Sequence, residues 1–351
     1  MKIGILTASR TDNNGTDLQA FAMQKLFCRL GAEDVEIIDY ICTKIDTKTP
    51  IKLNLRNLFF LPVYLYNRYA HRKFRKRNLN KSAKIYNKAN VHTIPYDAVV
   101  VGSDQVWNLD ITGGDVSFFL PFDKPGFRKY SYAVSLGTAK LDLWNEKYNI
   151  KQYLTSFDCI SVREKSGVEA LDKMGISSFQ SLDPILMTKR DDWLQFTMPA
   201  WKRNYILLYL VAYDSDAVMY AQKIADQKKC DVVMLNPGIK HWKGVKPYPF
   251  VSVERWINLV ANADMVITNS YHGLSFSILF QREIRLCLLP SSSKNNARLL
   301  DLVDELHLTD CILKKNKESF KSIDWVSVEE KRMRIGFESE EYVKSIIGGV
   351  E

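Results

Sequence analysis

The chain has 351 residues, with 46% hydrophobic and 25% charged side chains, a composition that excludes general disorder. Its 49 Lys and Arg against 40 Asp and Glu give a net charge of +9, but twelve of the basic residues lie in an acid-free stretch, residues 48–96. The rest of the chain carries 37 basic and 40 acidic residues, a net charge of −3, which excludes a globally basic nucleic-acid coat protein.

Short apolar runs alternate with helical patterns along most of the chain. Runs rich in β-branched residues and apolar on both faces are typical of strands in a parallel sheet covered by helices. Repeated strand–helix units indicate right-handed crossovers and the α/β class. In chain order we predict strands at residues 2–9, 36–40, 98–101, 130–135, 159–162, 205–212, 231–235, 265–268 and 284–289, with helices at residues 15–30, 215–228, 253–262 and 272–280.

The alternation of strands and helices restarts after Arg203. The length of the chain also suggests two domains of about 150 residues each. We therefore predict two Rossmann-like domains that face a cleft, residues 1–195 and 196–351, with C-terminal helices of the second domain crossing back to the first. Residues 48–96 are interpreted as a basic helical insertion in the first domain. Ligands of such sheets bind outside the carboxyl ends of the strands, so the cleft is the expected site.

The cellular location is also suggested by the sequence. Its apolar runs fall short of the roughly 18 residues that cross a bilayer, and its N-terminal segment lacks the layout of a signal peptide. The six cysteines are scattered without close pairs, which predicts a reduced chain with neither a disulfide framework nor a zinc site. We expect a cytoplasmic protein.

The loop after the first predicted strand contains Asn14 and Gly15 and opens a helix. Small residues at a helix N-terminus suit an anion, although a capped turn explains the same residues. With a single glycine, the loop matches neither the Walker A motif nor the dinucleotide fingerprint. The loop therefore gives no support for ATP or NAD as a ligand.

The loop after the strand at residues 98–101 is more polar than one helix cap requires. It supplies Ser103, Asp104, Gln105 and Trp107, which combine hydrogen-bonding groups with a flat apolar ring. This mixture suits a sugar, whose hydroxyls need polar partners while its C–H face stacks on an aromatic side chain. The alternative is an aspartate that caps a helix beside a tryptophan of the core.

An arginine and a histidine also lie directly after predicted strands. Arg163 can bind a carboxylate or a phosphate through its guanidinium fork, or it can form a surface pair with Glu164. His272 joins a buried strand to an apolar helix, where an imidazole can act as a general acid or base near neutral pH. A structural histidine is the alternative, but the neighbouring Asn269 and Ser270 favour a functional role.

The last polar loop adds Lys294 and Arg298 beside several serines and a helix start, which suits an anion or a plain flexible loop. Together these loops predict a cleft that binds an anion and a polyol, with one histidine and two or three cationic side chains. No cluster of metal ligands is visible in the sequence, and we expect neither a metal nor a bound cofactor.

Several of these loops belong to a series of short motifs in a specific order and spacing. Through this series, from Lys2 to about His307, the chain resembles the bacterial polysaccharide pyruvyl transferases. The motifs are Asn14-Gly15 with Leu18-Gln19-Ala20, Gly102-Ser103-Asp104-Gln105-Val106-Trp107, Tyr132-Ala133-Val134-Ser135-Leu136-Gly137, Ser161-Val162-Arg163-Glu164, Leu182-Asp183-Pro184, Ser270-Tyr271-His272-Gly273 and Asn296 to Arg298.

The resemblance implies a GT-B-like pair of domains and a reaction. Members of the family transfer the enolpyruvyl group of phosphoenolpyruvate, as co-substrate, to a sugar of a cell-surface polysaccharide or its lipid-linked precursor, releasing phosphate. The second domain is then the donor side and the first the acceptor side. The residues implied are His272 for acid/base catalysis, Arg163, Ser270, Tyr271, Lys294 and Arg298 for the donor, and Asn14, Gly15, Ser103, Asp104, Gln105 and Trp107 for the acceptor.

The chain departs from the family pattern at one position. In the better-known branch an arginine two residues before the histidine helps to hold phosphoenolpyruvate, and here Ser270 stands in its place. Either Arg298 or Lys294 supplies the missing charge, or the anion is held differently.

Two other functions share part of this evidence. A glycosyltransferase that uses a nucleotide sugar would have the same fold, because a fold does not determine a function. A nucleic-acid binder would use residues 68–88, where Tyr69 and Phe74 lie among basic side chains. The polar loops would then lack a purpose, so we expect no nucleic-acid partner.

The basic stretch suggests a second partner. From Asn57 to Lys88 an apolar and aromatic run is followed by a cluster of Lys and Arg, a pattern that suits lying on an anionic membrane. An ordinary solvated helix covering the first domain is the alternative. If the acceptor is lipid-linked, this segment would bring the site to it, with the protein peripheral at the inner face of the plasma membrane.

Overall fold

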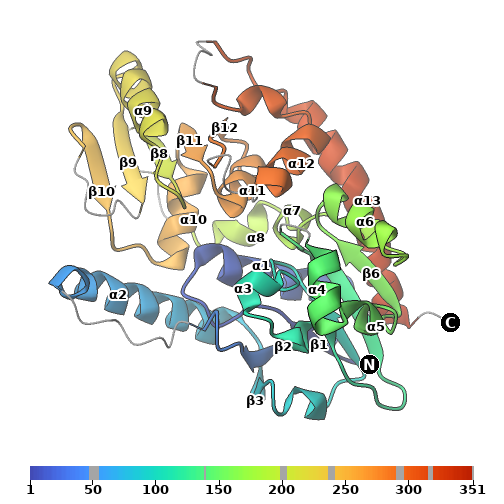
Figure 1. Cartoon of the computed structure of the whole chain (residues 1–351). Coiled ribbons are helices and arrows are strands. Elements are labelled where there is room, and N and C mark those ends of the chain that lie inside the picture. Colours follow the sequence, from blue (N-terminus) through green and yellow to red (C-terminus); the bar gives the residue numbers. More distant parts are fainter. Residues whose placement is uncertain are drawn as a thin grey trace. The chain divides into compact units, whose positions relative to one another are not determined.

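The computed structural model describes residues 1–46, 55–137, 140–197, 204–235, 242–289, 296–314 and 319–349, with the backbone alone for residues 55–59. The chain divides into two compact units. Unit 1 comprises Met1–Ile51, Lys73–Thr188 and Arg332–Glu351, and unit 2 comprises Lys52–Arg72 and Lys189–Lys331. Each unit is an α/β structure built on one parallel sheet (Figure 1).

Unit 1 contains a parallel sheet of seven strands in the order β3-β2-β1-β4-β5-β6-β7. All four side chains of the central strand β4 are buried, so both faces of the sheet are covered there. The strands are β1 (Lys2–Leu6), β2 (Asp34–Ile41), β3 (Lys81–Asn87), β4 (Ala98–Val101), β5 (Arg128–Val134), β6 (Cys159–Val162) and β7 (Phe179–Gln180).

The helices of unit 1 come from both ends of the chain. The long C-terminal helix α13 (Trp325–Gly348) bonds to this unit through Tyr342, whose hydroxyl donates to the carbonyl of Ser131 in β5 at 2.8 Å. The hydroxyl of Ser339 accepts from the N–H of Leu182 at 2.9 Å. The other helices are α1 (Asn14–Arg29), α3 (Leu109–Thr112), α4 (Leu141–Tyr148), α5 (Ile150–Leu154), α6 (Lys165–Lys173) and α7 (Pro184–Met187), with 3-10 turns at Val91–Thr93 and Val116–Phe119.

Unit 2 contains a parallel sheet of five strands in the order β10-β9-β8-β11-β12. Its strands are β8 (Tyr205–Tyr209), β9 (Asp231–Leu235), β10 (Val245–Tyr248), β11 (Met265–Thr268) and β12 (Glu283–Leu286). Its helices are α8 (Asp191–Leu194), α9 (Ser215–Lys228), α10 (Val253–Ala261), α11 (Tyr271–Leu279) and α12 (Ala297–Glu305), with a 3-10 turn at Thr309–Cys311. Helix α2 (Leu55–Asn78) begins in unit 2 and ends in unit 1.

Both sheets place their first strand in the interior of the strand order. In unit 1, the chain places β2 and β3 on one side of β1 and then returns to place β4 on the other side. In unit 2, it places β9 and β10 on one side of β8 and then returns to place β11 on the other side. Loops that follow the two adjacent strands therefore leave the sheet in opposite directions. This topological switch point is where ligands bind in open α/β sheets. The sequence-based α/β class with two Rossmann-like parts is confirmed.

Three strands were not predicted, namely β3, β7 and β10, and all three lie at sheet edges. Strand β3 buries little more than Ser82 and Tyr86, so its sequence lacks the apolar run by which interior strands are recognised. It falls within residues 48–96, so that stretch contains a strand of the unit 1 sheet as well as the basic helix α2. Among the described residues, no helix combines the length and the apolar character that crossing a bilayer requires.

Candidate functional site

The polar motif after β11 lies at the switch point of unit 2 and joins the two loops that meet there. The Asn269 side chain accepts from the N–H of Val211 at 2.7 Å and donates to the carbonyl of Ala212 at 2.6 Å. The hydroxyl of Thr268 donates to the carbonyl of Tyr209, the last residue of β8, at 2.6 Å. The loop after β8 is thus held to the motif by side chains of the motif itself.

Helix α11 starts at this motif because Ser270 caps it. Ser270 is extended, with φ −97° and ψ 132°, and its hydroxyl accepts from the N–H of Gly273 at 3.3 Å. A Cβ at Gly273 would lie 2.5 Å from the Thr268 hydroxyl oxygen and 2.9 Å from the Tyr209 ring. Glycine therefore allows the first turn of α11 to approach β8 and β11 closely.

His272 is the second residue of α11 and is held on a rigid helix. All nine residues of the helix are buried, and His272 itself is 8% exposed. One turn further on, the ring of Phe276 makes edge contacts with Trp193 at 4.7 Å and Trp256 at 5.1 Å between centroids. This aromatic cluster of unit 2 holds α11 in place, and with it the position of the imidazole.

The structure also brings a cation to this motif. The guanidinium carbon of Arg298, in the first turn of α12, lies 5.8 Å from the centroid of the Tyr271 ring, and the Tyr271 and His272 rings are 5.6 Å apart. Asn296 fixes the approach to α12, because its side chain accepts from the N–H of Leu289 and donates to its carbonyl, both at 2.8 Å. Lys294 lies outside the described residues.

Ser270, Tyr271, His272 and Arg298 thus form one cluster in unit 2, at the place where the fold puts ligands. A helix N-terminus and a guanidinium attract anionic groups, and an imidazole can transfer protons near neutral pH. The cluster is suited to binding an anionic substrate and moving a proton to or from it.

Replacing Asn269 with alanine is expected to destabilise unit 2 by about 1–3 kcal/mol, since it leaves the backbone groups of Val211 and Ala212 without their side-chain partner. Chemical denaturation measures the change. The matched control is Asn262→Ala, which removes an amide that bonds within the end of α10. An equal loss in the two variants would contradict the bridging role of Asn269.

At the switch point of unit 1, the loops after β1 and β4 are joined in a similar way. The hydroxyl of Thr7 donates to the carbonyl of Ser103 at 3.0 Å, and that of Thr16 donates to the carboxylate of Asp104 at 3.1 Å. Asn14 and Gly15 open α1 beside them, with the N–H of Gly15 bonded to the Asn13 side chain. The structure therefore brings Asn14, Gly15, Ser103 and Asp104 to one locality, as the motifs suggested.

The backbone of the loop after β4 has special requirements. Gly102 has φ +122°, and a Cβ there would lie 2.3 Å from the carbonyl oxygen of Tyr132. Asp104 has φ +74°, and its carboxylate also accepts from the N–H of Gln105 at 2.8 Å. The Gln105 side chain in turn accepts from the amide of Asn108 at 3.4 Å. The loop thus presents the Asp104 carboxylate in a fixed orientation.

The interpretation of Trp107 as a sugar-stacking residue is wrong. Its side chain is fully buried, its indole N–H donates to the carbonyl of Phe118 at 2.8 Å, and its ring stacks on Phe119 at 5.3 Å between centroids. A ring enclosed in this way has no face left for a ligand. Trp107 is a core residue that anchors the polar loop by packing against Phe118 and Phe119.

Arg163 is engaged by acidic side chains of unit 1. Its guanidinium donates to Asp183 at 2.9 Å and to Glu164 at 3.1 Å, and Arg163, Asp183 and Glu164 are almost fully buried. Asp183 also accepts from the hydroxyl of Ser103 at 3.3 Å and from the N–H of Ile185 at 2.9 Å. Three of the sequence motifs meet in this network, and its geometry favours a role for Arg163 in holding the Ser103 loop.

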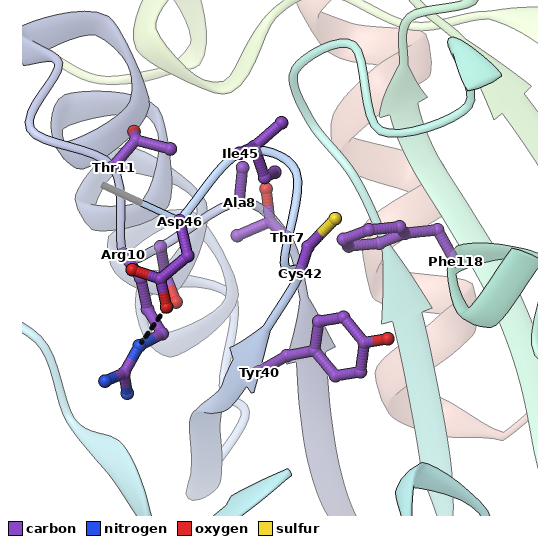
Figure 2. A pocket seen from close by; sticks show the side chains of 10 residues that line it. Thr7, Ala8, Arg10, Thr11, Tyr40, Cys42, Ile45, Asp46 and Phe118 are labelled. Carbon is purple, nitrogen blue, oxygen red and sulfur yellow. Dashed lines mark ion pairs between the residues drawn. The ribbon is translucent and has the colours of Figure 1, made fainter. Parts of the chain in front are cut away.

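A small pocket in unit 1 was not anticipated by the sequence (Figure 2). Its cavity volume is only about 10 Å³, it is open to solvent, and it contains the ion pair of Arg10 with Asp46 at 3.3 Å. The buried hydroxyl of Ser9 has no hydrogen-bond partner among the described residues. Burial, with a contribution from Asp115, raises the pKa of the Cys42 thiol to about 11, so this side chain is neutral at pH 7. The accessible lining of the pocket is mostly apolar, with few polar groups that can bond to a hydroxyl.

Within the described ranges, no group of three His, Cys, Asp or Glu side chains is arranged to hold a metal ion. Sequence reasoning placed Asp183 and Asn296 within motifs but assigned no role to either. Asp183 lies at the centre of the buried network, with Arg163 and Ser103 far away in the chain, and Asn296 fixes the start of α12 through Leu289.

Two Rossmann-like units with polar residues at both switch points are typical of a GT-B-like fold. Solved structures share this fold. The complex of MnaA from S. aureus with UDP aligns with a TM-score of 0.54 at 11% identity, covering 99% of this chain and 96% of that one. A UDP-GlcNAc 2-epimerase from Neisseria meningitidis bound to UDP-GlcNAc aligns with a TM-score of 0.51 at 10% identity, covering 100% and 95%.

The family comparison is more specific than the fold. The model of the polysaccharide pyruvyl transferase family matches residues 13–287, and the chain belongs to that family. It is therefore a transferase of polysaccharide biosynthesis. No curated protein sequence matches the chain.

Proposed function

We propose that the protein transfers the enolpyruvyl group of phosphoenolpyruvate to a saccharide acceptor, forming a cyclic pyruvate ketal and releasing phosphate. The observation that carries the proposal is the cluster of His272, Tyr271 and Arg298 at the switch point of unit 2. Membership of the family supports the same reaction class.

The donor has two anionic groups, a carboxylate and a phosphate. Arg298 and the N-terminus of α11 are the cationic and dipolar groups of the cluster, and they suit these anions. Because Ser270 stands where part of the family has an arginine, Arg298 is the residue to which we assign the missing charge. Lys294 is the second candidate named by the sequence.

The reaction needs proton transfers at defined steps. A proton adds to the methylene carbon of phosphoenolpyruvate, and positive charge develops on the adjacent carbon, which the first sugar hydroxyl attacks as it loses its own proton. The bond from that carbon to the phosphate oxygen then breaks as phosphate leaves, and a second hydroxyl closes the ketal as it loses its proton. We assign the movement of these protons to His272, because its position is fixed and an imidazole is the side chain suited to proton transfer near neutral pH.

The acceptor is assigned to unit 1. Asp104, held by Thr16, together with the start of α1 at Asn14 and Gly15, offers acceptors and donors for sugar hydroxyls. The acceptor class that fits is a polyol, in a cell-surface polysaccharide or its lipid-linked precursor.

A thermal-shift comparison tests the donor. Phosphoenolpyruvate at 100 times its dissociation constant is expected to stabilise the folded protein by about 2.7 kcal/mol. UDP-N-acetylglucosamine and inorganic phosphate at equal concentration serve as comparisons, and Arg298→Gln is expected to reduce the shift with phosphoenolpyruvate. Stabilisation by the nucleotide sugar instead would contradict the proposal and favour a glycosyltransferase.

A further inference from the structure

Helix α2, which is labelled in Figure 1, carries an unusual group of exposed apolar and aromatic side chains. Tyr64 is 48% exposed, Leu65 is 55% exposed and Tyr69 is 62% exposed. Tyr66 is also exposed, and its ring makes an edge contact at 5.5 Å with the exposed Phe250 of the loop after β10. Single exposed apolar residues are ordinary, but a contiguous group of them marks an interaction surface.

One row of exposed residues runs along α2, while Tyr64 and Tyr66 project to either side of it. Leu65, Tyr69, Arg72 and Lys76 follow one another at spacings of four, three and four residues, so they form a stripe along one face. On the opposite face, Ala70, His71, Phe74 and Arg75 are buried. The stripe starts with apolar side chains and ends with basic ones, and Lys73 and Arg77 are exposed beside its basic end.

Not every basic residue of residues 48–96 belongs to this surface. Arg75 is buried, and its guanidinium pairs with Asp12 at 3.1 Å and with Asp17 at 3.2 Å. Lys81 pairs with Asp39. These two cations are part of the internal structure of unit 1, whereas Arg72 and Lys76 are exposed on the stripe.

Arg75 also connects α2 to the acceptor side of unit 1. The same guanidinium donates to the carbonyl of Thr11 at 2.6 Å, and Asp12 and Asp17 flank the N-terminus of α1. The loop that leads into Asn14 and Gly15 is therefore bonded directly to the last turns of α2. A partner that fixes the position of α2 is therefore expected to fix the position of that loop as well.

We propose that the Leu65–Tyr69–Arg72–Lys76 stripe of α2 docks on the surface of an anionic membrane. Charge complementarity favours this partner, because Arg72, Lys73, Lys76 and Arg77 are exposed at the basic end of the stripe and residues 48–96 contain no acidic side chain. Aromatic side chains enter the boundary between headgroups and acyl chains, while Lys and Arg pair with anionic headgroups. Docking itself does not require the proposed reaction, but its purpose rests on it, since a lipid-linked acceptor would be presented at that surface.

Vesicle sedimentation with the full-length protein tests the docking. Binding is expected to vesicles that contain anionic phosphatidylglycerol, to fall in high salt, and to be weak with phosphatidylcholine alone. The variant Arg72→Glu/Lys76→Glu/Arg77→Glu is expected to bind on the order of 100-fold more weakly, because each basic residue near the surface contributes about 1 kcal/mol. Leu65→Ser tests the apolar part and is expected to weaken binding without changing the charge.

The matched control is Lys223→Glu/Lys228→Glu/Lys229→Glu, which changes the net charge equally at exposed positions of α9 and the residue after it. It is expected to bind nearly as the unchanged protein does. Equal binding by both triple variants would overturn the proposal, as would equal binding to neutral vesicles. Binding of single-stranded RNA without binding of anionic vesicles would assign the surface to another partner. Thermal shift with phosphoenolpyruvate needs no membrane, so failure of docking and failure of the proposed reaction are told apart.

Discussion

Replacing His272 with asparagine is expected to lower phosphate release from phosphoenolpyruvate and acceptor by roughly 10²- to 10⁴-fold, the usual contribution of a positioned acid/base group. Asparagine is similar in size to histidine and keeps hydrogen-bonding groups, but its side chain cannot take up or release a proton near neutral pH. Helix α11 is held by the Ser270 cap and by the contacts of Phe276 with Trp193 and Trp256, so the site should keep its form. Steady-state phosphate release measures the loss.

Two measurements separate a chemical role of His272 from a structural one. The thermal shift with phosphoenolpyruvate is expected to persist in His272→Asn, because Arg298 and the helix N-terminus remain. His307→Asn is the matched control, since His307 is an exposed histidine of the same unit with φ +54°, a conformation that asparagine tolerates. Near-normal turnover of His272→Asn would rule out the acid/base role.

Replacing Asp183 with alanine is expected to destabilise unit 1 by about 3–5 kcal/mol, the range for breaking a buried ion pair by removing one partner. The change removes a carboxylate from Arg163 and takes acceptors from Ser103 and Ile185. Since Ser103 begins the polar loop after β4, acceptor binding is expected to weaken as well. Chemical denaturation followed by circular dichroism measures the stability.

The comparison for Asp183 is an exposed ion pair of the same unit. On α13 the Lys344 ammonium lies 2.8 Å from the Glu341 carboxylate, and both side chains are about half exposed. Exposed ion pairs of this kind contribute about 0–1 kcal/mol to the free energy of unfolding. Glu341→Ala should therefore change the stability little. If Asp183→Ala cost no more than Glu341→Ala, the network would not be what holds the Ser103 loop.

The sequence allowed the interior strands and the His272 motif to be predicted, because both depend on local patterns. Strand β4 is a run of four apolar residues, and the motif after β11 stands out as polar residues between a buried strand and an apolar helix. The edge strands β3, β7 and β10 escaped prediction because they bury few side chains or are very short. Their positions depend on pairing with neighbours that are distant in the chain.

The roles of individual side chains were harder to predict than their positions. Trp107 and Arg163 lie where the motifs place them, yet Trp107 is enclosed by Phe118 and Phe119, and Arg163 is engaged by Asp183. Arg75 belongs to the basic stretch of the sequence, yet it is buried and paired with Asp12 and Asp17. In each case the role of the side chain depends on a contact with a residue elsewhere in the chain. The sequence alone does not show that the two residues are close in space.

The C-terminal helix α13 determines how this protein can be divided. Tyr342 and Ser339 bond to β5 and to the segment before α7, so the last part of the gene encodes a support for the first part of the fold. A truncation at Thr188, which looks like the end of a domain in the linear sequence, would deprive unit 1 of both contacts. A shortened clone that ends there should yield insoluble or protease-sensitive material, and the two halves of the enzyme cannot be exchanged between relatives as simple consecutive blocks.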